Sequence, residues 1–184
     1  MDYALTTERL ALCPVTADDH RALLAHWTLP DVRRFLFDGA LLSAAEVSET
    51  IEESTRDFAD GGYGIWIIRE HAGADLAGAD LARSDLADPD LAGTAGLRPL
   101  DGIGLEIFYS LAPGAWGRGY ATEAARAVVG HALGTLGLTE VLAEIDEGNT
   151  ASVAVVKRLG MVPFAVVPGR LGPMTRYRTP PRTR

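Results

Sequence analysis

A glycine-rich turn in the second half of this sequence is well suited to binding a charged ligand. Residues 112–121 read Ala-Pro-Gly-Ala-Trp-Gly-Arg-Gly-Tyr-Ala, and apolar residues at helical spacing over 121–136 predict that a long amphipathic helix follows. Such a turn directs several backbone N–H groups, and the positive end of the helix dipole, at one point that can bind a pyrophosphate. Gly117 and Gly119 would allow close approach of the backbone, and Arg118 could add a positive charge.

Two familiar phosphate-binding patterns do not fit this turn. A P-loop would continue with Lys and then Ser or Thr, where this chain has Tyr120 and Ala121. A dinucleotide-binding turn would have a third glycine in place of Thr122, and only one strand–helix–strand unit remains downstream. Glycine turns before helices also occur for steric reasons alone, so the turn by itself leaves both interpretations open.

A second motif follows the next expected strand, which covers residues 141–145. Asn149-Thr150-Ala151-Ser152 begins another helix, which ends at Leu-Gly-Met over 159–161. The succession of strand, Trp-Gly-x-Gly-Tyr-Ala-Thr-Glu, helix, strand, Asn-x-Ala-Ser, helix and Leu-Gly-Met resembles the GNAT acyl-CoA N-acyltransferases. It is most similar to the branch of ribosomal-protein-alanine N-acetyltransferases. The element order matches over most of the chain, and the specific motifs span residues 105–161.

The resemblance implies a site for acetyl-CoA as co-substrate. In that family the loop corresponding to 116–122 holds the pyrophosphate with backbone amides. The pantetheine arm enters between two splayed strands, here 107–111 and 141–145, and imitates a strand with its own amides. Asn149 resembles a residue that contacts the pantetheine, and Ser152 resembles one near the thioester sulfur. The residues assigned to the cofactor are Tyr109, Ser110, Leu111, Trp116, Gly117, Arg118, Gly119, Tyr120, Ala121, Thr122, Asn149 and Ser152.

The sequence departs from the family pattern at two places. Gly114 stands where relatives often have a basic residue or glutamine, three positions before the first glycine of the loop, so binding must rely on backbone amides and Arg118. Lys157 and Arg158 stand where many relatives have Glu-Lys, which adds charge to a helix face that we expect to be exposed.

Acyl transfer from a thioester to an amine requires a neutral amine, a polarised carbonyl and a proton for the leaving thiolate. Glu106, on the strand edge beside the splay, is the candidate general base, and Ser152 is the candidate donor to the sulfur. A backbone N–H near Tyr109 could polarise the carbonyl. The alternatives remain open: Glu106 also fits an ion-paired strand carboxylate, Ser152 and Asn149 fit helix-capping residues, and Tyr109 and Tyr120 are alternative proton donors.

The expected elements predict one α+β domain over residues 1–184. The resemblance implies the GNAT fold, a mixed and mostly antiparallel sheet of six or seven strands with a splayed central pair and about four flanking helices. A capping-box pair, Ser43 and Glu46, marks one helix start, and Asp101-Gly102 marks a hairpin turn. We expect strands at 9–14, 63–69, 91–98, 105–111, 141–145, 162–167 and 174–178, and helices at 17–29, 43–61, 121–136 and 150–159, with a further helical turn at 31–36.

Residues 72–90 contain a strict five-residue period. The triplets at 74–76, 79–81, 84–86 and 89–91 end in Asp-Leu, and alanine follows each. This phase matches the pentapeptide repeat of a square β-solenoid, but four units supply only about one coil, and solenoids need several stacked repeats. The preferred interpretation is a duplication that lengthens a hairpin turn. A rival hypothesis is a non-catalytic acyl-CoA-binding or interaction module that uses this repeat as a docking surface.

Composition limits the remaining function classes. The 184 residues carry a formal charge of −8 at pH 7, which disfavours nucleic acid as a partner. No leader pattern and no apolar run of membrane-spanning length is recognisable, so we expect a cytoplasmic protein without a membrane partner. A single cysteine excludes an internal disulfide, and the dispersed histidines predict no metal site. The sequence does not distinguish between a protein N-terminus and a small-molecule primary amine as the acceptor. It does not show whether the chain forms a homodimer.

Overall fold

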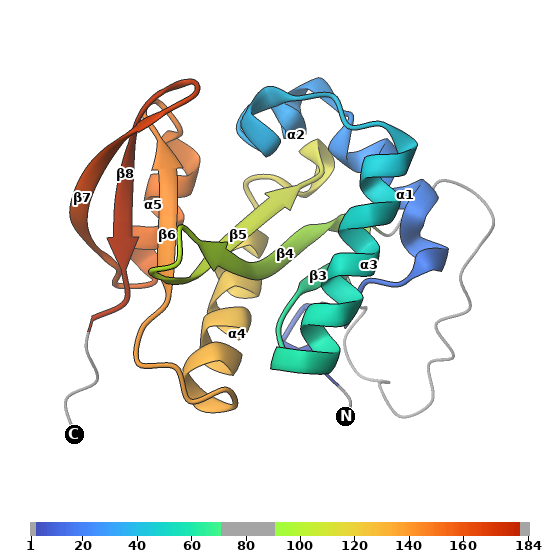
Figure 1. Ribbon diagram of the computed structural model, residues 1–184, viewed down its shortest axis with the longest axis horizontal. Helices are drawn as coiled ribbons and strands as arrows, with labels where there is room; N and C mark the ends of the chain where they lie inside the picture. The colour runs from blue at the N-terminus through green and yellow to red at the C-terminus, as the bar shows by residue number, and fades with distance from the viewer. Residues whose placement is uncertain (1–2, 71–90, 181–184) are drawn as a thin grey trace.

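The computed structural model describes residues 3–70 and 91–180. They form an eight-stranded sheet in the order β1-β2-β3-β4-β5-β6-β8-β7, with five α-helices packed against it (Figure 1). The strands are β1 Leu5–Thr6, β2 Leu10–Pro14, β3 Ile65–Glu70, β4 Leu91–Leu100, β5 Gly104–Leu111, β6 Leu142–Asp146, β7 Val162–Gly169 and β8 Gly172–Arg178. The helices are α1 His20–Trp27, α2 Pro30–Arg33, α3 Ala44–Gly61, α4 Tyr120–Gly134 and α5 Thr150–Arg158.

The sheet has eight strands, so the expectation of six or seven was wrong by at least one. The strand missed is β1, which pairs with β2 at only two positions, Leu5 with Leu12 and Thr6 with Ala11. A two-residue strand is too short to show an alternation in the sequence, and its partner was the only signal for it. The helix count is roughly as expected, because the fifth helix, α2, is a four-residue segment where one further helical turn was predicted.

The ends of α3 follow from local chemistry. The backbone N–H of Ser43 donates to a carboxylate oxygen of Glu46 at 2.7 Å, and the N–H of Glu46 donates to the Ser43 hydroxyl at 3.3 Å. This reciprocal pair satisfies two donors that the helix start would leave unpaired. At the other end Gly62 adopts φ 71°, the left-handed conformation that ends helices and favours glycine.

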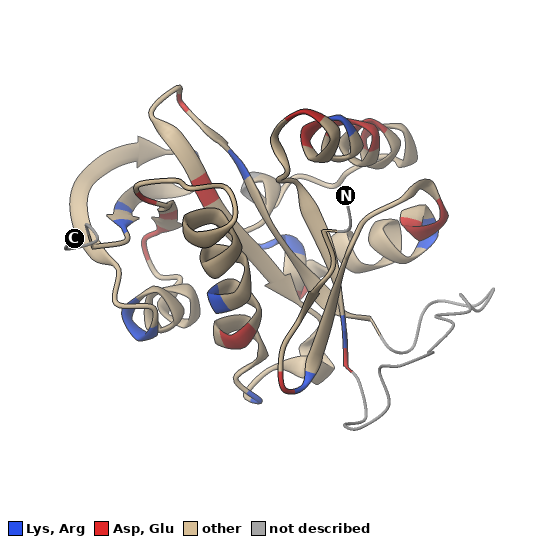
Figure 2. Cartoon of the chain, turned by 90° about the horizontal axis from the view of Figure 1, so that it is seen from below, with Lys and Arg blue, Asp and Glu red and all other residues tan. Residues whose placement is uncertain are grey.

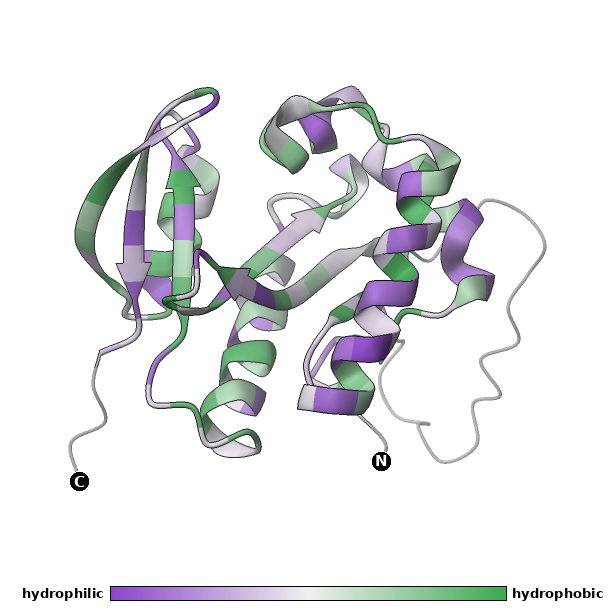
Figure 3. Ribbon diagram, in the orientation of Figure 1, coloured by the Kyte–Doolittle hydropathy of each residue, from purple (hydrophilic) through white to green (hydrophobic). Residues whose placement is uncertain are grey.

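Alternating side chains of β3 divide the core into two layers. Ile65 and Ile67 pack with Trp27 and other residues of the helices α1 to α3, whereas Trp66 and Ile68 pack with the apolar side of α4. Helices α1 to α3 therefore cover one face of the sheet, and α4 and α5 cover the other (Figure 1). Apolar residues line the inner sides of these helices and polar residues their outer sides (Figure 3).

Strands β5 and β6 separate after a single paired position. On one side β5 pairs with β4 at eight successive positions. On the other side only Glu106 pairs with Leu142 of β6, in parallel register, and the two strands then diverge (Figure 1). The splayed pair expected from the resemblance is therefore present. It leaves one edge of β5 open from Ile107 to Leu111.

The repeat at 72–90 lies outside the described residues, so its structure stays a prediction. Strands β3 and β4 on either side of it pair antiparallel, as expected for the two arms of a hairpin. Among the residues that the structure describes, no helix is long and apolar enough to cross a membrane.

Gly93 provides a test of how closely β4 and β5 approach. Its φ is 155°, and a Cβ there would lie 2.0 Å from the Ser110 carbonyl oxygen. We expect Gly93→Ala to lower the free energy of unfolding by about 1–3 kcal/mol, because backbone must move to admit the methyl group. Gly114→Ala is the matched control, since nothing lies within 4 Å of a Cβ at that position. Equal urea midpoints for the two variants would contradict this packing.

Candidate functional site

The predicted pyrophosphate loop is built from two left-handed glycines at the start of α4. Gly117 has φ 73°, and Gly119, the N-cap, has φ 82°. The first intrahelical bond runs from the Glu123 N–H to the Gly119 carbonyl at 3.1 Å. The amides of 119–122 therefore precede the helical ladder and point out of the helix end, an arrangement that suits an anion.

Trp116 fastens this loop to the end of β5. Its indole N–H donates to the Leu111 carbonyl at 2.9 Å, while half of its surface stays exposed. The next residues of the loop differ in burial: Tyr120 and Thr122 are buried and Ala121 is half-buried. For these three residues only the backbone is suited to contact a phosphate.

Arg118 lies in the predicted position, but an acidic partner already holds it. Its guanidinium donates to both carboxylate oxygens of Glu70, at 2.7 and 2.5 Å, and lies 4.5 Å from the centre of the Tyr120 ring. Arg9 lies 4.8 Å from the same ring, donates to the Arg118 carbonyl and pairs with Glu123. Acidic and basic positions lie close together at this end of the molecule (Figure 2). The pairs of Glu70 with Arg118 and of Arg9 with Glu123 were missed, because nothing in the sequence relates residues so far apart.

Strand alternation determines which backbone groups face the splay. The Ala112 N–H bonds the Ala92 carbonyl of β4 at 2.9 Å. Because backbone groups alternate along a strand, those of Ser110 also face β4, whereas those of Tyr109 and Leu111 face the open edge. The Leu97 N–H bonds Gly64 across the other edge of β4, which agrees with this phase. Of the three predicted backbone ligands, the geometry favours Tyr109 and Leu111 over Ser110.

The start of α5 lies against the same edge. The Asn149 side chain accepts from the Ser152 N–H at 3.1 Å, so Asn149 caps the helix as the structural alternative anticipated. The Tyr109 hydroxyl donates to the Ser152 carbonyl at 3.3 Å, which joins β5 to α5. Burial raises the pKa of Tyr109 to about 12, so the phenol stays protonated near neutral pH. Ser152 is half-buried.

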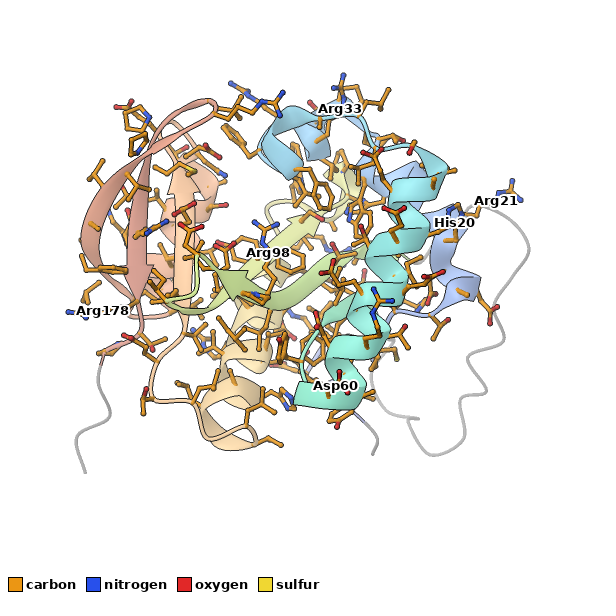
Figure 4. The ribbon with its side chains drawn as sticks, in the orientation of Figure 1. His20, Arg21, Arg33, Asp60, Arg98 and Arg178 are labelled. Carbon is orange, nitrogen blue, oxygen red and sulfur yellow. The ribbon has the colours of Figure 1, made fainter. Side chains whose placement is uncertain are left out.

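Glu106 lies at the point where the splay begins. It is 4% exposed, and Arg98 Nε donates to one of its carboxylate oxygens at 2.7 Å. Arg98 lies near the centre of the molecule in Figure 4, over β4 and β5. Burial raises the pKa of Glu106, while the charge and hydrogen bond of Arg98 oppose that rise. The sequence did not reveal Arg98, although its register partner across the β4–β5 pair is Glu106 itself.

A chain of polar side chains runs beneath the same strand. His26 Nε2 lies 2.9 Å from the Ser110 hydroxyl, which lies 2.9 Å from the Thr94 hydroxyl. The Trp27 indole N–H donates to Thr94 at 3.3 Å. Burial lowers the pKa of His26 to about 4, so its imidazole is neutral near pH 7. The sequence showed His26 only as one of several dispersed histidines.

Within residues 3–70 and 91–180 no three His, Cys, Asp or Glu side chains are grouped so that they could hold a metal ion. The described groups at the splay include backbone amides, the buried carboxylate of Glu106 and several hydroxyls. This set suits binding of an extended amide-bearing ligand and proton transfer beside it.

Comparison with known proteins identifies the class. The acetyltransferase (GNAT) domain family matches residues 9–162, so the chain belongs to the GNAT acetyltransferase family. This confirms the resemblance, with acetyl-CoA as the co-substrate of that family. The relation to the ribosomal-protein branch stays a prediction.

Two curated relatives match over short segments. The protein YkkB of Bacillus subtilis is 42% identical over 57 residues, which are 31% of this chain and 33% of that protein. The FsC-acetyl coenzyme A-N(2)-transacetylase of Aspergillus fumigatus is 37% identical over 76 residues, 41% of this chain and 30% of the relative. The matched segments thus cover about a third of these relatives.

Solved structures share the fold over nearly the whole chain. An acetyltransferase from Agrobacterium tumefaciens superposes with a TM-score of 0.75 at 23% identity, covering 95% of this chain and 92% of that one. The microcin C7 self-immunity acetyltransferase MccE, solved with acetyl-CoA and AMP, gives a TM-score of 0.71 at 16% identity, with 94% and 93% covered. At these identities the likeness shows the fold.

Gly119→Ala tests whether the α4 amides bind the cofactor. A side chain at φ 82° is strained by about 1–2 kcal/mol, so we expect the KM for acetyl-CoA to rise about five- to 30-fold as the loop moves. Gly130→Ala is the control in the same helix, where nothing lies within 4 Å of a Cβ; it should stabilise the protein by about 0.5–1 kcal/mol and leave this KM unchanged. A KM unaffected by Gly119→Ala, measured by thiol release, would remove the loop from the site.

Proposed function

We propose that the protein transfers an acetyl group from acetyl-CoA to a primary amine by direct attack within a ternary complex. The observation that carries the proposal is the open edge of β5. This edge begins at the buried carboxylate of Glu106 and leads toward the amides at the start of α4.

The cofactor arrangement follows from that edge. The pantetheine amides would pair with the backbone of Tyr109 and Leu111, in the place that a neighbouring strand would otherwise occupy. The pyrophosphate would sit on the amides of 119–122. Asn149 and Ser152 would flank the arm at the start of α5, and Trp116 would stay beside the loop as a partly exposed wall.

Arg118 would add positive charge at the loop beside its present partner. Two of its N–H groups bond Glu70 in an exposed bidentate pair, and the guanidinium has further N–H donors. Phosphate oxygens accept from guanidinium as carboxylate oxygens do, so Arg118 would bond the cofactor with its remaining donors or in exchange for Glu70.

The chemistry requires one bond to form and one to break. The amine nitrogen attacks the thioester carbonyl carbon, the C–N bond forms, and the C–S bond then breaks to give the thiolate of CoA. Glu106 would accept the proton that the amine loses, directly or through water, and a hydroxyl of Ser152 or Tyr109 would protonate the thiolate. A backbone N–H of β5, that of Tyr109, would polarise the carbonyl.

The nature of the acceptor is the less constrained part of the proposal. The name of the fungal relative describes acetyl transfer to an N(2) nitrogen, which supports a nitrogen acceptor in this family. Either a protein N-terminus or a small-molecule amine fits the proposal. Because acetyl-CoA is an intracellular metabolite, the proposal also places the reaction in the cytoplasm.

An amine panel with acetyl-CoA tests the proposed reaction. Thiol release and the mass of the product are measured together for amino acid amides, peptides and alkylamines. We expect release of one thiol for each N-acetylated product. Tight binding of acetyl-CoA without release from any amine would instead indicate a module that binds the cofactor and does not turn it over.

Glu106→Gln tests the general base. We expect kcat/KM to fall by about 10²-fold or more, because removing a positioned base costs that much. In the unaltered protein the base must be ionised, so activity falls as pH falls through its pKa, and because burial raises that pKa the acidic limb should lie above the ordinary value of 4.5.

Arg98→Gln provides the matched comparison, since Arg98 stabilises the ionised carboxylate. Its loss should move the acidic limb of the pH profile further upward without abolishing activity. A Glu106→Gln protein with unchanged activity and the same acidic limb would assign Glu106 to structure alone. Loss in Ser152→Ala would identify the serine as the thiolate's proton donor, and full activity would leave that role to Tyr109.

A further inference from the structure

The polar chain beneath β5 ends in a buried histidine. His26 lies in the last turn of α1, is 3% exposed, and touches the Ser110 hydroxyl through Nε2 at 2.9 Å. The chain continues through Thr94 to the indole of Trp27. Three elements of the fold, α1, β4 and β5, therefore meet at this set of hydrogen bonds.

One arrangement of the protons joins all four side chains. The Trp27 indole nitrogen can only donate, so the Thr94 oxygen accepts from it. If Thr94 in turn donates to Ser110 and Ser110 donates to His26 Nε2, the neutral imidazole carries its proton on Nδ1. Burial favours that neutral form, because it lowers the pKa of His26 to about 4.

The Nδ1 atom of His26 is buried and has no hydrogen-bond partner within the described part of the chain. A buried polar group without a partner is unfavourable, and native proteins satisfy such groups with water or a ligand. Among the described residues His131 is also a buried histidine, but its Nε2 lies 2.8 Å from the Gly62 carbonyl on the α4 side of the sheet.

The unpaired donor lies on the face of β5 that carries the proposed base. Side chains alternate along a strand, so Glu106, Phe108 and Ser110 share one face, opposite the face packed against α4. The imidazole ring is small and rigid, so Nδ1 lies within one ring width of the atom that touches Ser110. An amine attacking near Phe108 would have Glu106 about 7 Å away along the strand on one side, and Ser110 with His26 at a similar distance on the other.

We propose that His26 is a specificity-determining residue, whose Nδ1–H donates to an oxygen that the acceptor carries beside its amine. The acceptors selected are amines with a neighbouring carbonyl, carboxylate or hydroxyl oxygen, and simple alkylamines are disfavoured because they leave the buried donor unpaired. This inference rests on the proposed acetyl transfer. It assigns to one residue of this chain a selection of the acceptor that the cofactor motifs do not provide.

Matched acceptors test the proposal in turnover. Alaninamide and sec-butylamine share a branched carbon that bears the amine, and only alaninamide has the oxygen. The two amines ionise differently, so kcat/KM is expressed per concentration of neutral amine. On this scale the unaltered protein should favour alaninamide by about five- to 150-fold, chiefly through KM, which is the range for an unpaired buried donor. His26→Phe should remove most of this preference, and His26→Asn, whose amide nitrogen can replace Nδ1, should restore part of it.

His131→Phe is the control for loss of a buried histidine. His131 packs against Tyr3 and Trp66, away from the proposed acceptor face, so its loss should leave the preference intact even if stability falls. A preference that is absent in the unaltered protein, or that His26→Phe preserves, overturns the proposal. So does an equal change of preference in His26→Phe and His131→Phe.

A second measurement does not depend on turnover. Nitrogen NMR of the full chain labelled at histidine, with CoA bound, reports which ring nitrogen of His26 is protonated. We expect the proton on Nδ1, and a shift of that resonance with alaninamide but not with sec-butylamine. A proton on Nε2, or the same response to both amines as a buried water would give, overturns the inference. If no amine in the panel is acetylated, the proposed function fails, and this spectrum still decides the role of His26.

Discussion

The single bridge between β5 and β6 is the constraint on which the rest of the site depends. An interior strand of a sheet normally satisfies its backbone groups on both sides. Here β5 is fully paired with β4, yet meets β6 only at Glu106 and Leu142. The backbone of Tyr109 and Leu111 is thereby left for a ligand that can imitate a strand, and an acyl-CoA arm with two amides is such a ligand.

Strand alternation then separates the two substrates across one element. Odd-numbered positions of β5 direct backbone groups to the splay and side chains to the α4 layer, as Tyr109 does in reaching Ser152. Even-numbered positions direct Glu106 and Ser110 to the opposite face, where α1 supplies His26. One strand can therefore bind the cofactor with its backbone and contact the acceptor with its side chains. The hydrogen bond from the Ala112 N–H to the Ala92 carbonyl of β4 sets the phase of that alternation.

Most of the fold could be predicted because its signals are local. The cap of α3, the loop before α4, the Asn149 cap and the hairpin turn at Asp101 all depend on residues within a few positions of one another. The splayed strands and the cofactor were predicted from the order of two motifs, because that order resembles the GNAT family. Strand β1 could not be predicted, because two residues carry no periodicity and only the partner strand defines them.

The acceptor side of the site could be predicted less well, because its contacts are not local in the sequence. The contacts of Glu70 with Arg118, and of His26 with Ser110, join residues that the sequence separates widely and the fold brings together. No spacing rule relates such residues. Even the backbone preference for Tyr109 over Ser110 required the register with β4, although both had been named as candidates.

Hydrogen exchange at the β5 amides tests the central claim most directly, because it reports whether the cofactor completes this strand. The account predicts that acetyl-CoA slows exchange at Tyr109 and Leu111, whose amides face the open edge, and changes little at Ser110, whose amide is already bonded to β4. Equal protection of all three amides, or none at Tyr109 and Leu111 with acetyl-CoA saturating, would contradict it.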